Sequence, residues 1–401
     1  MTTELVNELC NRVGENTDLY TSISDDAIRS KITEAVMEKS RHILLSANEK
    51  IELINLVFNR MRGMDILQPL LDNEEITEIM VNGPDRIFIE KKGGIVPVSV
   101  KCDAKQLEDI IQKIVSSVNR TVNEANPICD ARLKDGSRVH VVMKPLALNG
   151  PILTIRKFSK APMDINTLIS YGTITEEAAD TLKKLVEAKY NIFICGGTGS
   201  GKTTFLNVLS NFIPKDERII TIEDTAELQI TGVANLVRLE TRNANPDGEG
   251  EIRIRDLIRA GLRMRPDRIV VGEVRGEEAL DMLQAMNTGH EGSLSTGHGN
   301  SCKDMISRLE TMVLTAARMP VESIRKQIAS ALDIMIFLSR MKDKSRKVME
   351  VSEVAGYKDG EVLLNPLYKY EVLKDGTGKL VRTENDMVNK DKFMIYGSGM
   401  I

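Results

Sequence analysis

One eight-residue segment constrains this chain more than any other. Residues 196–203 spell GGTGSGKT, which fits the pattern G-x-x-x-x-G-K-[ST] of a phosphate-binding P-loop. The apolar run NIFIC (191–195) precedes it, and KTTFLNVLSNF (202–212) has the pattern of a helix. Glycines let the backbone fold around a phosphate, and the N-terminus of the following helix adds partial positive charge. The segment therefore predicts a nucleotide-binding domain of the α/β class.

The P-loop residues have separate predicted roles. Lys202 is expected to reach the β- and γ-phosphates, and the hydroxyl of Thr203 is expected to bind Mg²⁺. The GTPase signature N-K-x-D is absent, which makes ATP the expected nucleotide. Kinases, transporters, GTPases and motors share this motif, so it gives no function by itself. The predicted nucleotide-binding residues are Gly196, Gly197, Thr198, Gly199, Ser200, Gly201, Lys202, Thr203 and Thr204.

Two apolar runs end in carboxylates that suit catalysis. RIITIED (218–224) places Glu223 at the end of an expected strand, where a carboxylate can deprotonate the attacking water. Asp224 suits the same role or the N-cap of a helix. RIVVGE (268–273) ends in Glu273, and Gly272 occupies the position of the usual Walker B aspartate. Glu273 is therefore expected to hold Mg²⁺ through water, with a solvated loop residue as the alternative.

Two histidines and two groups of arginines are further candidates. His290 and His298 lie in glycine-flanked segments around the expected strand GSLSTGH (292–298), which favours a sensor or switch role over metal binding. A cation is also needed near the γ-phosphate in the transition state. The candidates are Arg238, Arg242, Arg253, Arg255, Arg259, Arg263, Arg265 and Arg268 in one group, and Arg132, Arg138 and Arg156 in the other.

The length of 401 residues predicts two or three domains. Residues 1–71 have helical patterns, and Ser24 is a good N-cap for the helix that follows it. Residues 72–160 mix strands with one helix and predict a small α+β domain. Strands and helices alternate in 161–345, as in a parallel sheet with crossover helices, after an expected linker at Ala161-Pro162. Residues 346–401 add short strands and a polar tail.

Composition excludes several classes of protein. The net charge of −4 does not suit a nucleic-acid coat protein. Five scattered cysteines without a C-x-x-C pair indicate reduced thiols and no structural zinc site. No apolar run approaches the 18 or so residues of a membrane span, and the N-terminus lacks a signal-peptide core. We therefore expect a cytoplasmic protein that meets a membrane only through partners.

Four segments together resemble a known superfamily. GGTGSGKTT, TIEDTAEL, RPDRIVVGEVRG and TGHEGSLSTGH are similar to the Walker A, Asp, Walker B and His boxes of the secretion and pilus-assembly ATPases. Upstream, ITEIMVNGPDRIFIE, DARLKDGSRVH and GPILTIRKF resemble the CpaF branch, which serves Tad/Flp-type pili. The likeness covers roughly residues 65–340. The absence of C-x-x-C favours the CpaF or conjugation branches over the type II secretion and extension-motor branch.

The resemblance implies a fold, an assembly and roles for residues. It implies a RecA-like ATPase domain, a PAS-like N-terminal domain and a homohexamer with ATP between the two domains. It implies a motor at the cytoplasmic face of the inner membrane that drives a platform protein. Glu223 would activate water, Glu273 would support Mg²⁺, and His290 and His298 would belong to the His box. The resemblance also implies that N-terminal-domain arginines contact the γ-phosphate; the candidates are Arg138 and Arg156, with Arg132 less favoured.

Two other functions stay open at this point. A DNA-translocating conjugation-type ATPase would use the same sheet, although the net charge of −4 and the absence of tryptophan argue against nucleic-acid binding. A nucleotide-gated scaffold with negligible turnover would need no carboxylate to activate water, and Glu223 and Glu273 argue against it.

Overall fold

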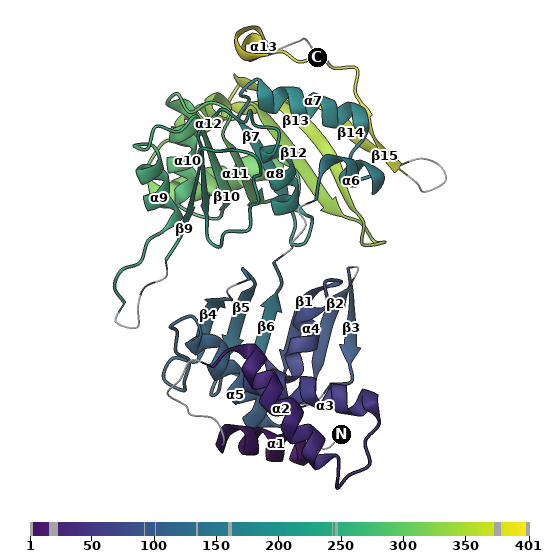
Figure 1. Ribbon diagram of the computed structural model, residues 1–401. Helices are drawn as coiled ribbons and strands as arrows, with labels where there is room; N and C mark the ends of the chain where they lie inside the picture. The colour runs from purple at the N-terminus through teal and green to yellow at the C-terminus, as the bar shows by residue number, and fades with distance from the viewer. Residues whose placement is uncertain are drawn as a thin grey trace. The chain divides into compact units, whose positions relative to one another are not determined.

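A computed structural model describes most of the chain, and it divides into two compact units, Met1–Ser159 and Lys160–Ile401 (Figure 1). The described residues are 3–15, 23–91, 93–100, 102–133, 135–158, 163–242, 244, 248–372 and 378–397. The expected linker at Ala161-Pro162 lies outside them.

The first unit begins with three helices that have their own small core. They are α1 (Thr3–Glu15), α2 (Asp25–Lys39) and α3 (Ala47–Met61). Ser24 caps α2, as expected, and Ser46 forms a capping box with Glu49 at the start of α3. Leu53 and Val57 of α3 are buried, whereas Ile51 is 59 % exposed.

The rest of the first unit is one antiparallel sheet with a helix on one face. The short helices η1 (Asp65–Leu67) and α4 (Gln68–Asp72) lead into it. Its strands are β1 (Ile76–Asn82), β2 (Ile87–Lys91), β3 (Gly94–Val98), β4 (Ile128–Arg132), β5 (Arg138–Val142) and β6 (Ile152–Arg156), in the order β3-β2-β1-β6-β5-β4. Helix α5 (Ala104–Ser116) buries Leu107, Ile111 and Ile114 in its core. Lys113 of α5 donates to the carbonyls of Met61 and Gly63, which joins the helical segment to this domain.

The second unit is built on a nine-stranded sheet. Its strands are β7 (Ile192–Gly196), β8 (Ile219–Glu223), β9 (Leu236–Glu240), β10 (Arg268–Val274), β11 (Leu294–His298), β12 (Ile334–Arg340), β13 (Arg346–Lys358), β14 (Glu361–Val372) and β15 (Gly378–Arg382). The order is β15-β14-β13-β12-β7-β11-β10-β8-β9, and the six strands from β12 to β9 are parallel. All residues of β7 and β8 are buried, as expected for central parallel strands.

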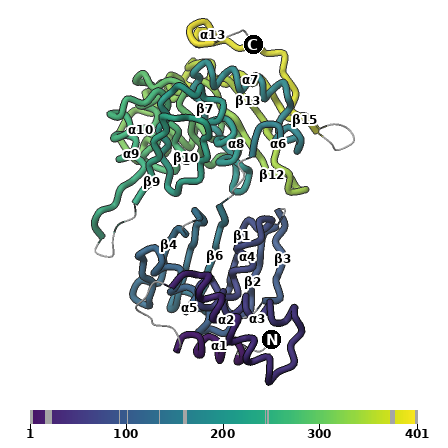
Figure 2. The backbone as a smooth tube through the Cα atoms, in the orientation of Figure 1, coloured from purple at the N-terminus to yellow at the C-terminus, as the bar shows by residue number. Residues whose placement is uncertain are grey.

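Helices cover both faces of this sheet (Figures 1 and 2). One face packs against α6 (Ile165–Ser170), α7 (Glu176–Glu187) and α8 (Lys202–Ser210). The other packs against α9 (Ile254–Gly261), α10 (Glu278–Asn287), α11 (Cys302–Ala316) and α12 (Val321–Ala331). Such a three-layer arrangement places the carboxyl ends of the parallel strands along one edge, where ligands bind in open α/β sheets.

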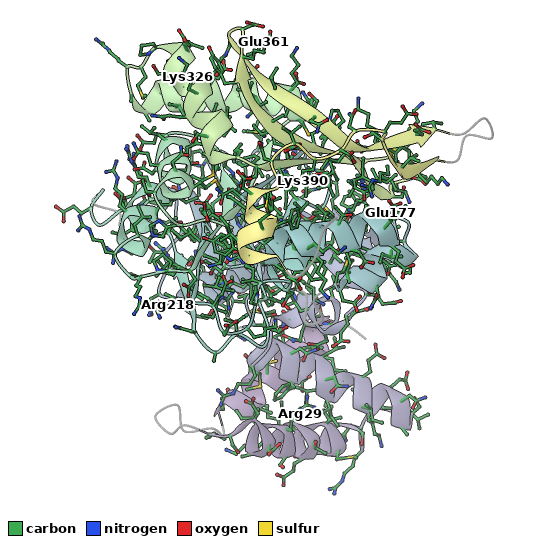
Figure 3. The ribbon with its side chains drawn as sticks, turned by 90° about the horizontal axis from the view of Figure 1, so that it is seen from above. Arg29, Glu177, Arg218, Lys326, Glu361 and Lys390 are labelled. Atoms are coloured by element: carbon green, nitrogen blue, oxygen red, sulfur yellow. The ribbon has the colours of Figure 1, made fainter. Side chains whose placement is uncertain are left out.

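The end of the chain returns to the sheet. Figure 3 shows α12, with Lys326, near the strand that begins at Glu361, and the Lys326 ammonium lies 5.5 Å from the centre of the Tyr357 ring. Helix α13 (Asp391–Tyr396) packs Phe393 on Tyr190, with 4.9 Å between the ring centres. Within the described part of the chain, no helix is long and apolar enough to cross a membrane.

Candidate active site

The P-loop joins the end of β7 to the start of α8. Gly199 and Gly201 have φ angles of 71° and 93°, which glycine adopts without strain. Gly201 is the N-cap of α8 and offers no side chain to its first N–H groups, which leaves them for an anion. A Cβ at Gly196 would lie 2.5 Å from the carbonyl oxygen of Leu338 and 2.6 Å from Oγ of Ser200. The loop therefore requires glycine at these positions.

Lys202 is directed into the loop. Its side chain is buried, and Nζ donates to the carbonyl oxygens of Gly196 and Gly197, each at 3.2 Å. Nζ also lies 3.4 Å from Nδ1 of His298. Burial lowers the pKa of Lys202, and the nearby Glu273 carboxylate opposes that shift. A largely desolvated cation held by neutral carbonyls is poised to pair with a phosphate.

Three neighbouring strands bring Glu273 and His298 to this lysine. Strand β11 pairs with β7 and with β10, and its His298 is in register with Gly196. The hydroxyl of Thr296 donates to the carbonyl of Gly272 at 2.7 Å, which ties β11 to β10 beside the carboxylate. Nε2 of His298 lies 2.8 Å from Oε1 of Glu273. Burial and the charge of Lys202 lower the pKa of His298, which favours the neutral ring.

Glu223 lies on β8, next to β10. Its side chain is 3 % exposed, and Oε1 accepts hydrogen bonds from the backbone N–H groups of Glu227 and Leu228. Oε2 is buried without a hydrogen-bond partner. Desolvation raises the pKa of Glu223 to about 7, against the lowering effect of those backbone donors. A carboxylate with one open oxygen and a pKa near neutrality is suited to general-base chemistry.

The unusual glycine of the Walker B segment has a structural explanation. A Cβ on Gly272 would lie 3.0 Å from Cγ of Glu223. The glutamate side chain from β8 thus fills the space over β10 that an aspartate at 272 would need. No helix follows Asp224, so its alternative role as an N-cap was wrong.

The two box histidines lie at opposite ends of one strand. His298 ends β11 beside the P-loop, whereas His290 precedes the strand at Leu294. A five-residue strand spans about 16 Å, so the structure does not bring His290 to the P-loop of its own chain. Nδ1 of His290 is buried without a hydrogen-bond partner, and its role in the His box stays a prediction.

Six of the eight candidate arginines of the second unit contact carboxylates or carbonyls of that unit. Arg268 is fully buried and pairs with Glu217. Arg255 contacts Glu277, and Arg259 pairs with Asp281 at 2.7 Å. The remaining contacts in this group include Arg253 with Glu251 and Glu277, Arg238 with the carbonyl of Leu228, and Arg242 with the carbonyl of Gly250.

Sequence reasoning missed Arg275, which contacts the site directly. Its Nε and Nη2 donate to Oε2 of Glu273 at 2.8 and 2.5 Å, and Nη1 lies 3.5 Å from Oδ2 of Asp224. Its position two residues after Glu273 could have predicted this contact, because alternate residues at the end of a strand point to the same side of the sheet.

The arginines of the first unit form one row. Arg138 on β5 is in register with Arg132 on β4 and with Arg156 on β6. Like charges directly opposite each other destabilise a sheet, so such a row suits binding of an anion. Nη2 of Arg138 lies 3.8 Å from Asp130, which offsets part of that charge. Contact of Arg138 or Arg156 with a γ-phosphate stays a prediction.

The residues at the P-loop fit Mg·ATP. Oγ of Ser200 is buried without a hydrogen-bond partner, beside a glycine cradle and a desolvated lysine. Among the described residues, no three His, Cys, Asp or Glu side chains are grouped to hold a metal ion. Magnesium bound to nucleotides takes most of its ligands from phosphate and water, with one or two from protein, so Thr203 and Glu273 suffice.

Comparison with known proteins places this site in a family. The sequence profile described as "Type II/IV secretion system protein" matches residues 60–366, more than half of the chain. The chain belongs to this family. The recognition of the secretion and pilus-assembly ATPase superfamily is thereby confirmed, and residues 1–59 and 367–401 lie outside the matched region.

Two similar proteins are named as components of conjugal transfer or type IV secretion systems. The conjugal transfer protein TrbB of Rhizobium radiobacter is 32 % identical over 299 residues, covering 74 % of this chain and 88 % of TrbB. The type IV secretion system protein PtlH of Bordetella pertussis is 31 % identical over 324 residues, covering 74 % of this chain and 94 % of PtlH. The pilus retraction motor PilT with bound ADP has a similar fold, with a TM-score of 0.54, 21 % identity and coverage of 75 % of this chain and 82 % of PilT. The predicted fold class is confirmed.

Proposed function

We propose that this chain is an ATPase motor that hydrolyses Mg·ATP to drive assembly of a Tad/Flp-type pilus or a related secretion process. The observation that supports hydrolysis is the group at the P-loop. Lys202, His298 and Glu273 come from three different elements and meet within hydrogen-bonding or ion-pair distance. Membership of the secretion and pilus ATPase family supports the motor role.

Each residue has a part in the proposed reaction. The N–H groups at the start of α8 and the Lys202 ammonium bind the phosphates and stabilise the charge that develops on transfer. Glu223 takes a proton from the attacking water, for which its open Oε2 is suited. His298 lies between Lys202 and Glu273 and orients both. Thr203 and, through water, Glu273 would hold Mg²⁺, which would supply neutralisation of phosphate charge.

The assembly is proposed on the resemblance to the family. A homohexameric ring would sit at the cytoplasmic face of the inner membrane and act on a platform protein. The row formed by Arg132, Arg138 and Arg156 would supply cations to the γ-phosphate from the N-terminal domain. No direct role for nucleic acid is expected, and membrane contact would occur only through partners.

The catalytic proposal is tested with the purified full chain. Phosphate release is measured with and without Mg²⁺ in the wild type and in Lys202→Ala. Lys326→Ala is the matched control, because Lys326 is an exposed lysine paired with Glu322 on α12. We expect Mg²⁺-dependent hydrolysis that Lys202→Ala abolishes and Lys326→Ala retains. Wild-type turnover in Lys202→Ala would remove the proposed site, and no turnover in any variant would favour the nucleotide-gated scaffold.

The biological task needs a test in the cell. The gene is deleted, surface pili are counted, and wild-type and Lys202→Ala copies are compared for restoring them. We expect only the wild-type copy to restore pili, with hexamers of the purified chain in native mass spectrometry. Normal pili in the deletion strain would exclude the pilus assignment while leaving the ATPase assignment intact.

A DNA-translocating conjugation ATPase is the second candidate. It is favoured by the name of TrbB, which is a conjugal transfer protein. Hydrolysis would then be stimulated by DNA, and salt would weaken the stimulation as counterion release requires. Hydrolysis that DNA leaves unchanged at low salt would exclude this candidate.

A further inference from the structure

Arg275 links the two acidic strands of the site. It follows β10, and its guanidinium contacts Glu273 through two N–H groups and approaches Asp224, the residue after β8, with a third. The two strands are adjacent and parallel, so both carboxylates lie at the same edge of the sheet. One cation therefore holds together two anions that would otherwise repel each other.

The contact engages the carboxylate that is proposed to support Mg²⁺. Oε2 of Glu273 accepts both N–H groups of Arg275, while Oε1 faces His298 at 2.8 Å. A carboxylate that accepts a hydrogen bond from metal-bound water needs an oxygen directed at that water. Oε2 already accepts two N–H groups and Oε1 lies against His298, so metal-bound water that bonds Glu273 competes with these two groups.

Of the two residues that contact Glu273, Arg275 can be displaced at a lower free-energy cost than His298. Its side chain is 58 % exposed, whereas that of His298 is 36 % exposed and is held at the P-loop by its contact with Lys202. An ion pair with an exposed arginine is worth little, because water solvates the released guanidinium. Glu273 itself is 19 % exposed and stays in place.

We propose that Arg275 is a positioning residue that holds Glu273 through Oε2, competes there with Mg²⁺, and gives up this contact when metal binds with nucleotide. This inference rests on the proposed ATPase function. A ligand shifts an equilibrium only through contacts that differ between the two states of the protein. The Arg275–Glu273 contacts that break when metal binds therefore lower the apparent affinity for the metal. Release of Arg275 also frees Asp224, so occupancy of the metal site changes the contacts of β8.

The experiment measures metal affinity directly. Mn²⁺ replaces Mg²⁺ as a paramagnetic probe and is titrated into the full chain with a non-hydrolysable ATP analogue, and free Mn²⁺ is followed by EPR. Arg275→Gln is expected to tighten Mn²⁺ binding by about two- to fivefold, the range that an exposed ion pair supports. Arg275→Lys retains the charge and is expected to bind Mn²⁺ as the wild type does.

Arg325→Gln is the matched control. Nε and Nη2 of Arg325, on α12, donate to Oε1 and Oε2 of Glu310, on α11. We expect its Mn²⁺ affinity to equal that of the wild type. Unchanged or weaker Mn²⁺ binding in Arg275→Gln would overturn the competition. If the wild type itself bound no Mn²⁺ with the analogue and hydrolysed no ATP, the proposed function would fail instead.

Discussion

The state of Glu223 gives the most demanding prediction. Burial raises the pKa of this carboxyl from 4.5 to about 7. If Glu223 is the base, only its ionised form is active, and the ionised fraction rises from about one tenth at pH 6 to about nine tenths at pH 8. Hydrolysis should therefore increase about tenfold over this range. An ordinary glutamate is already ionised at pH 6, and the same range would change the rate by only a few per cent.

The same shift has a consequence for stability, with a definite sign. Between pH 4.5 and 7 the unfolded chain has lost this proton while the folded chain retains it, so the folded state binds more protons and stability falls as pH rises. The rise in the pKa from 4.5 to about 7 corresponds to a change of about 3 kcal/mol in the free energy of unfolding. Glu223→Gln cannot ionise, so its stability relative to the wild type should increase by about this amount from pH 4.5 to pH 8.

Both consequences are measured on the same proteins. Phosphate release is recorded from pH 6 to 8, and the free energy of unfolding is measured by urea titration from pH 4.5 to 8. Glu240→Gln is the matched control, because Glu240 is exposed on β9 and is directly in register with Glu223. A wild-type rate that stays flat over this range, or a Glu223→Gln protein with normal turnover, would refute the assignment of Glu223 as the base.

Three further predictions concern packing and metal. Arg268→Met should destabilise the fold by about 3–5 kcal/mol in urea titrations, because it leaves the carboxylate of Glu217 without its buried guanidinium. Gly272→Ala should lower kcat about ten- to hundredfold with a native melting temperature, since the new methyl group displaces the side chain of Glu223. Chelation with EDTA should stop hydrolysis and leave the melting temperature unchanged, because no described cluster of side chains holds a structural metal.

Local patterns were sufficient to predict the elements that carry the site. The strands predicted around residues 191–195, 218–224, 268–273 and 292–298 correspond to β7, β8, β10 and β11. Strands β7, β8 and β10 are runs of mostly apolar, buried residues, which parallel strands require on both faces, whereas β11 (LSTGH) is buried but mostly polar and was predicted from its flanking glycines. The P-loop was predicted from its local pattern, although the close contact that requires glycine at 196 comes from the carbonyl of the distant Leu338.

The contacts between strands could not be read from the sequence. Strand order decides which carboxylate meets which cation, and β11 lies between β7 and β10 although it follows both in the chain. This order brings His298 to Lys202 and leaves His290 at the far end of the strand. Arg275 was missed for the same reason, since its two carboxylate partners lie on different strands.

The site is a series of alternating contacts that crosses the sheet from the P-loop to the end of β8. Lys202 lies against His298, His298 against Glu273, Glu273 against Arg275, and Arg275 near Asp224. Under the proposed ATPase function, a phosphate paired with Lys202 would weaken the first contact, and a metal at Glu273 would weaken the third. Glu223 ends β8 directly before Asp224, so under the same proposal the surroundings of the candidate base would respond to binding at the P-loop.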